Sequence, residues 1–112
     1  MSLFRSDLWV AAFVRRHNDV GHLCVVSRRG DPVAGQIFLA VDHLNGTVSL
    51  FTPAPAAKRR EEDGADRIFE CRFDHVEPAK VRDRIAREVD FDPDVWVVEL
   101  EMRSGDLGIA SV

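Results

Sequence analysis

The chain has 112 residues, which suffices for one domain and leaves no room for a second hydrophobic core. Its hydrophobic share of 46% and charged share of 30% are those of an ordinary globular protein. The net charge of −4 excludes a global field that attracts nucleic acid or an anionic membrane, and no apolar run approaches the ~18 residues of a membrane span. We therefore expect a single soluble domain over residues 1–112 without a membrane partner.

Hydrophobic periodicity predicts two helices among several strands. Ser6 and Asp7 precede a helix expected over about 7–17, and Pro78 suits the first turn of a second helix ending near Val89. Alternating apolar residues predict strands elsewhere. These strands are expected at 23–28, in the two arms of a hairpin within 35–51, at 68–73 and at 95–102, with the tail 107–112 along an edge.

The hairpin is the clearest local prediction. Asn45-Gly46 is typical of a two-residue type I′ turn, because both central residues of that turn need a positive φ. Such a turn places Val41 opposite Leu50 and Leu39 opposite residue 52. It predicts one apolar core face formed by Ile37, Leu39, Val41, Val48 and Leu50.

The order α-β-β-β-β-α-β lacks regular alternation and predicts an α+β fold. We expect a mainly antiparallel sheet of about five to six strands, beginning with a three-stranded meander, with both helices packed on one face. The segment 53–66 is rich in proline, alanine and charge, so we expect a mobile loop there. After the second helix, Asp92-Pro93 predicts a turn and Phe91 is expected to plug the core.

The two cysteines indicate a reducing compartment. Cys24 and Cys71 lie far apart, and each falls in an apolar strand pattern where a free cysteine behaves as a small hydrophobic residue. The first residues contain no apolar stretch of the kind that a signal peptide needs. We expect a reduced, cytoplasmic protein.

Four polar residues are candidates for a site. His17, Asp19 and His22 carry donors that suit a metal ion, but their spacing matches no dedicated site, and a solvated turn is favoured. His43 falls at the rim of the hairpin, where its pKa could shift, although a partly exposed strand-end histidine is the simpler interpretation. We predict no catalytic residue, cofactor or metal ion.

Arginine supplies 13 of the 15 basic residues. Three basic clusters, at Arg15-Arg16, Arg28-Arg29 and 58–60, would form a patch for a small anion if the end of the first helix, the first strand connection and the long loop meet at one end of the sheet. Solvated charge is the favoured interpretation. For the arginine excess, a GC-rich genome is favoured over recognition of carboxylate or phosphate groups.

Several segments together resemble a known family. They are Trp9 with Arg15-Arg16, the stretch Ala34-Gly-Gln-Ile-Phe, the Asn45-Gly46 turn leading to Phe51-Thr-Pro-Ala-Pro55, Phe69-Glu70, and Phe91-Asp-Pro-Asp-Val-Trp-Val-Val-Glu99. Their order over nearly the whole chain resembles a family of small alphaproteobacterial proteins catalogued only as a domain of unknown function. The resemblance implies a compact, free-standing cytoplasmic protein and supplies no activity, cofactor or catalytic residue.

The favoured function is a non-enzymatic protein-interaction module that self-associates, with a homodimer as the simplest form. Phe38, Phe51, Val95 and Val97 stand opposite the main apolar surface, so they either line a second layer or form an exposed patch. One alternative is a small enzyme or ligand-binding protein that holds an anionic group with the arginine clusters and uses His17, His22 or His43 as acid or base. A second is nucleic-acid binding, against which the acidic net charge weighs.

Overall fold

The computed structural model describes residues 5–55 and 67–112. It has two helices and six strands in the expected order, so the α+β class is confirmed and the tail supplies a short sixth strand. The elements are α1 (Ser6–Asp19), β1 (Leu23–Arg28), β2 (Ile37–Asp42), β3 (Val48–Pro53), β4 (Ile68–Val76), α2 (Pro78–Phe91), β5 (Trp96–Glu101) and β6 (Ala110–Ser111). From residue 56 onward, the predicted mobile loop lies outside the described residues.

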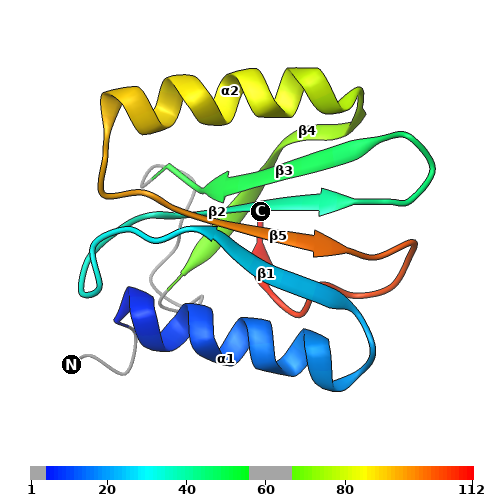
Figure 1. Ribbon diagram of the computed structural model, residues 1–112, viewed down its shortest axis with the longest axis horizontal. Helices are drawn as coiled ribbons and strands as arrows, with labels where there is room; N and C mark the ends of the chain where they lie inside the picture. The colour runs from blue at the N-terminus through cyan, green and yellow to red at the C-terminus, as the bar shows by residue number, and fades with distance from the viewer. Residues whose placement is uncertain (1–4, 56–66) are drawn as a thin grey trace.

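The strands form one sheet in the order β1-β5-β2-β3-β4-β6 (Figure 1). The pairs β2–β5 and β4–β6 are parallel and the other neighbours are antiparallel, so the sheet is mainly antiparallel as predicted. The predicted meander of β1, β2 and β3 is wrong in its first pairing, because β5 lies between β1 and β2. The run Val95–Val98 is apolar on both sides, and a central position buries both sides where an edge position would not.

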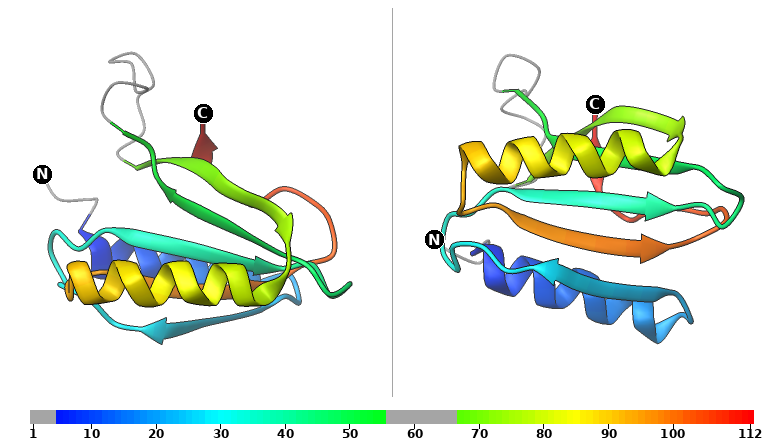
Figure 2. Two further views of the ribbon diagram at one scale, coloured as in Figure 1. Left: turned by 90° about the horizontal axis from the view of Figure 1, so that it is seen from above. Right: turned by 45° about the horizontal axis from the view of Figure 1, so that its top comes forward.

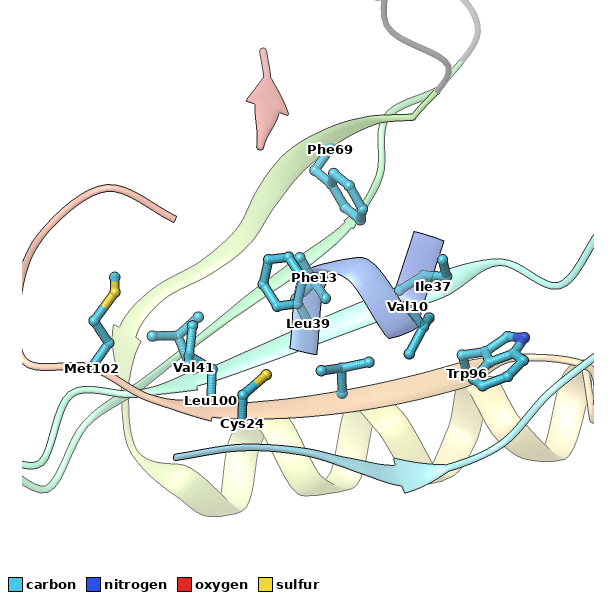
Figure 3. Packing of buried hydrophobic residues seen from close by; sticks show 11 residues of the cluster. Val10, Phe13, Cys24, Ile37, Leu39, Val41, Phe69, Trp96, Leu100 and Met102 are labelled. Carbon is cyan, nitrogen blue, oxygen red and sulfur yellow. The ribbon is translucent and has the colours of Figure 1, made fainter. Parts of the chain in front are cut away.

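The two helices cover opposite faces of the sheet, so the prediction that both pack on one face is wrong (Figure 1). On the α1 face, Val10 and Phe13 pack against Ile37, Leu39, Trp96 and their neighbours (Figure 3). On the α2 face, Val81 packs against Phe38 and Val97. The physical reason lies in β2, whose first five residues are all buried and therefore need cover on both sides.

The register of the hairpin differs from the prediction by one residue. Val41 pairs with Ser49 and Ala40 with Leu50, and His43 N donates to Thr47 O at 3.1 Å, which leaves residues 44–46 in the loop. A three-residue loop replaces the predicted two-residue turn because Leu44 and Gly46 take the positive φ values. The shift moves Val48 and Leu50 to the α2 face, so the predicted single core face is divided between the two sides.

Strand β4 changes face along its length. Register shifts in its pairing with β3 fall around Leu50, so Phe69 packs into the α1-side cluster while Phe73 contacts the α2-side cluster. Cys71 lies between them and is exposed, in contrast to the buried Cys24. The prediction that both cysteines behave as small core residues therefore holds for Cys24 alone.

The prediction that Phe91 plugs the core is wrong. The side chain lies at the end of α2 and is 89% exposed.

The start of α1, the β1–β2 connection and the start of β5 meet at one corner. Asp31 N donates to Asp94 O at 3.0 Å, and the Trp96 indole Nε1 donates to Asp31 O at 2.7 Å. Gly30 and Gly35 both lie against the Asp94 carbonyl, where an added Cβ would collide with the backbone. Glycine is needed at these two positions because of this close approach.

Candidate functional site

Only two of the four arginines in the predicted anion patch lie side by side. Arg15 and Arg29 line one shallow depression between α1 and β1, where the Arg29 guanidinium lies 5.0 Å from the ring centre of Trp96. Arg16 instead donates to Gly108 O at 3.2 Å, and Arg28 donates to Arg29 O at 3.0 Å. The carboxylate of Asp7 also lines the depression and reduces its positive charge. The four arginines therefore do not converge on one anion, and the third predicted cluster, at 58–60, lies outside the described residues.

His17 and His22 are brought together, and Asp19 is not part of their contact. His17 Nε2 lies 2.8 Å from Leu107 O, and the two Nδ1 atoms lie 3.0 Å apart. Because a carbonyl only accepts, His17 carries a proton on Nε2, and in the neutral ring its Nδ1 then accepts from the Nδ1–H of His22. The pair fixes the segment around Leu107 against the end of α1. No group of three or more metal-binding side chains is found within the part of the chain that the structure describes.

His43 lies in a separate polar network at the hairpin end of the sheet. Its Nε2 is 2.8 Å from Ser49 Oγ, its ring stacks on His75 at 3.7 Å, and Asp74 Oδ1 is 2.6 Å from His75 Nδ1. Burial and then the neighbouring His75 lower the pKa of His43. Ser49 is 1% exposed and also accepts from His75 N at 2.9 Å. Its hydroxyl group is thus inaccessible to a substrate carbonyl, and its contacts with His43 and His75 provide this buried group with hydrogen-bond partners.

A groove on the α2 face was not predicted from the sequence. It encloses about 250 Å³ between the first half of α2 and strand β1. In the right-hand view of Figure 2, β2 and β5 are seen between α2 and β1. The lining is apolar from Leu23, Val25, Ala40, Val48, Pro78, Val81, Ile85 and Leu100, and charged from Asp42, Arg82, Glu99 and Glu101.

The strand register explains why the charges gather in this groove. Ala40 pairs with Glu99 and Asp42 with Glu101, so the three carboxylates share one face of two neighbouring strands. Asp42 Oδ1 accepts from Leu44 N at 2.8 Å. Among the described residues, Glu99 and Glu101 form no salt bridge. With three carboxylates and the single guanidinium of Arg82, the groove therefore presents an excess of negative charge beside apolar side chains.

Part of this site is visible in the sequence. The alternation of β5 predicts that Glu99 and Glu101 point away from Trp96 and Leu100, and the structure agrees. The same alternation in β1 places Leu23 and Val25 opposite the buried Cys24, and they are 56% and 43% exposed. The sequence does not reveal that α2 packs over other strands of the sheet and leaves the face near β1 uncovered.

The predicted second apolar face is a covered layer. Phe38, Val95 and Val97 are buried beneath α2, and Phe51 packs against the α1-side cluster. The second-layer alternative is therefore correct for Phe38, Val95 and Val97, whereas Phe51 lies on the other side of the sheet, so these residues form no common exposed patch. The exposed apolar surface beside them is at Leu23 and Val25.

The described residues form a mixed six-stranded sheet with one helix on each face, which defines a small α+β protein class. The chain matches the family described as protein of unknown function (DUF1491) over residues 4–109, and it belongs to that family. The resemblance inferred from segments such as Phe91–Glu99 is thereby confirmed. No curated protein matches the chain.

Solved structures of similar proteins have the same fold. A crystal structure of a DUF1491 family protein from Caulobacter crescentus is 30% identical, with a TM-score of 0.79, and the alignment covers 100% of this chain and 99% of that one. A solution structure of a protein from A. tumefaciens is 34% identical, with a TM-score of 0.82 and coverage of 100% and 96%. Neither described helix of the present chain is long and apolar enough to cross a membrane.

Proposed function

We propose that this protein is a non-enzymatic interaction module that receives a segment of a partner protein in the groove beside α2. The observation that carries the proposal is an apolar groove left open on the sheet, bordered by the exposed Leu23 and Val25. Exposed apolar surface with a polar rim is typical of interaction sites. At about 250 Å³, the groove is below the roughly 300–1,000 Å³ of small-molecule pockets, so it suits one or two anchoring side chains.

The remaining polar clusters support a binding role over a catalytic one. In the described residues, the nearest arrangement to a catalytic triad uses Ser49, whose hydroxyl is buried. Asp74 there contacts Ser49 and His75, so it does not orient His43 as the acid of a triad orients its histidine.

We further propose that the module works in the bacterial cytoplasm. Relatives from Caulobacter and A. tumefaciens support a bacterial origin. Cys24 and Cys71 are both free, which suits a reducing compartment. A second copy of the chain remains a candidate partner, and light scattering over a concentration series distinguishes a dimer from a monomer.

Peptide display tests the proposed function. Random peptides are selected on the folded protein and counter-screened against a Val25→Asp variant, which places a charge in the groove, and against a Leu8→Asp control on exposed α1 surface. We expect selected peptides to bind the wild type and the control but not the groove variant. If no selected peptide discriminates the variant from the control, the groove is not an interaction site.

A second candidate function is the binding of a small anion, because Arg15 and Arg29 share one depression. Thermal unfolding with inorganic phosphate tests it, since a ligand at ~100 times its Kd adds about 2.7 kcal/mol to the free energy of unfolding. We expect an Arg15→Gln variant to lose any such gain. Nucleic-acid binding is less favoured than the binding of a small anion, because the chain carries a net charge of −4.

A further inference from the structure

We infer that the segment bound in the groove presents a lysine or arginine side chain flanked by apolar residues. This inference rests on the proposed function and adds the chemistry of the partner. The groove offers two kinds of surface at once: apolar side chains such as Val25 and Ile85, and three carboxylates against the single guanidinium of Arg82. An occupant that matches both surfaces is apolar and positively charged.

The carboxylates lie close enough to act on one cation. Asp42 and Glu101 are direct partners on neighbouring strands, and Glu99 lies two residues before Glu101 on the same face. Neighbouring strands are about 4.8 Å apart, so the charges repel one another in the free protein. A cation placed among them relieves this repulsion as well as forming new ion pairs, which favours a basic partner over a neutral one.

The apolar residues of the groove fit the stem of the same side chain. Lysine and arginine bury their methylene groups on apolar surface while the charged head stays at a polar rim. Val25 and Val48 come from different strands and Ile85 from the facing helix, so a stem between them is contacted from both sides. Flanking apolar residues of the partner would then cover Leu23, which is exposed at the border.

The partner engages the face of β1 and not its outer edge. The Asn18 side chain donates from Nδ2 to Cys24 O at 3.0 Å and accepts from Cys24 N at 2.9 Å. These two bonds occupy main-chain groups that an added strand would need, and edge strands are commonly blocked in this way. Recognition therefore depends on side chains in the groove, where charge decides the choice of partner.

Synthetic peptides of matched sequence test the inference. Short blocked peptides with Leu-Arg-Leu at the centre and Gly-Ser ends are titrated into isotope-labelled protein, and backbone amide shifts are followed by NMR. Otherwise identical peptides carry Gln or Glu in place of Arg. We expect shifts centred on Leu23, Val25 and Glu99, with the Gln peptide about fivefold weaker and the Glu peptide weaker still. High salt should reduce the difference between the Arg and Gln peptides.

A double variant identifies the charges responsible. Glu99→Gln with Glu101→Gln should weaken the Arg peptide about fivefold and leave the Gln peptide unchanged. Asp83→Asn serves as the control, because Asp83 is an exposed carboxylate of α2 outside the groove lining, and it should leave both affinities unchanged.

The outcomes separate this inference from the proposed function. Equal binding of the Arg and Gln peptides at the groove overturns the cationic anchor and leaves the interaction module standing. Failure of every peptide, including those from display, to shift the groove residues overturns the proposed function itself. Spermidine that binds the groove as tightly as the Arg peptide overturns a protein segment as the source of the cation. A dimer that hides Val25 at the same protein concentration assigns the groove to a second copy and overturns the inference.

Discussion

The two faces of the sheet are covered to different extents. On the α1 face, eleven buried residues form one cluster that reaches from Trp96 to Met102 (Figure 3). On the α2 face, six buried residues form a smaller cluster, and the helix leaves the strand surface near β1 open. A helix of similar length thus closes one face and only part of the other. The difference predicts that stability is concentrated on the α1 face, and it leaves the proposed binding surface on the α2 face.

The largest expected effect is the loss of an aromatic side chain from the closed face. Phe13 is fully buried and stacks on Trp9 with ring centres 5.1 Å apart. A Phe13→Ala change should lower the free energy of unfolding by about 3–5 kcal/mol, because it leaves a cavity in the core. Urea denaturation measures the loss. The control Leu8→Ala, on the exposed side of α1, should change stability by less than about 0.5 kcal/mol.

A smaller loss is expected on the partly covered face. Val81 is the buried residue through which α2 packs on the sheet. Val81→Ala should cost about 2 kcal/mol, since two methyl groups leave an apolar environment and a small cavity remains. The same denaturation series checks this value. A loss as large as that of Phe13→Ala would contradict the unequal division of stability between the faces.

His43, at the hairpin end of the sheet, should make the free energy of unfolding depend on pH. Burial holds the pKa of His43 below its ordinary value, so near this value the unfolded chain binds more protons than the folded one. Stability should therefore fall as the pH drops below about 6.5, the ordinary histidine pKa. Denaturation at several pH values compares the wild type with His43→Gln, in which this part of the pH dependence should be reduced. An unchanged profile would show that other groups control it.

Groove substitutions should affect binding far more than folding. Leu23 is 56% exposed, so Leu23→Thr should change stability by less than about 0.5 kcal/mol. The same change should weaken the Leu-Arg-Leu peptide, because the peptide leucines lose an apolar contact. Parallel denaturation and NMR titration measure both quantities. A large loss of stability would mean that Leu23 belongs to the core.

The smallest expected effect has the opposite sign. Glu101 faces Asp42 across the strand pair and has no basic partner among the described residues. Neutralising one of two facing carboxylates in Glu101→Gln should raise the free energy of unfolding by about 0.2–0.5 kcal/mol at low salt. Added salt should remove the gain. A destabilised variant would mean that Glu101 forms a stabilising interaction in solution.

The elements could be predicted from the sequence, whereas the way they meet could not. The alternation in β5 correctly separates Trp96 and Leu100 from Glu99. The assignment of one core face fails because β2 is apolar at five consecutive positions, which is typical of a strand buried on both sides. In the sequence, this continuous apolar run of β2 is the feature that predicts a helix on each face of the sheet.

The candidate site shows the same limit. Histidines that lie near each other in sequence, such as His17 and His22, do meet, since a helix end and a short turn hold them together. His43 and His75 are far apart in the chain, and their stacking depends on the β3–β4 pairing. The groove depends on where α2 crosses the sheet. Local patterns do not contain that information, because the crossing is decided by packing between distant segments.

The central position of β5 has a consequence for how the molecule is made. Strands β1 and β2 are synthesised early but do not pair with each other, because each pairs with β5, the last long strand along the chain. Until the ribosome has released residues 96–101, the apolar sides of β1 and β2 have no shared partner. Such long-range pairing slows folding and leaves apolar strands exposed for longer. The growing chain must therefore wait for β5 before its sheet can close.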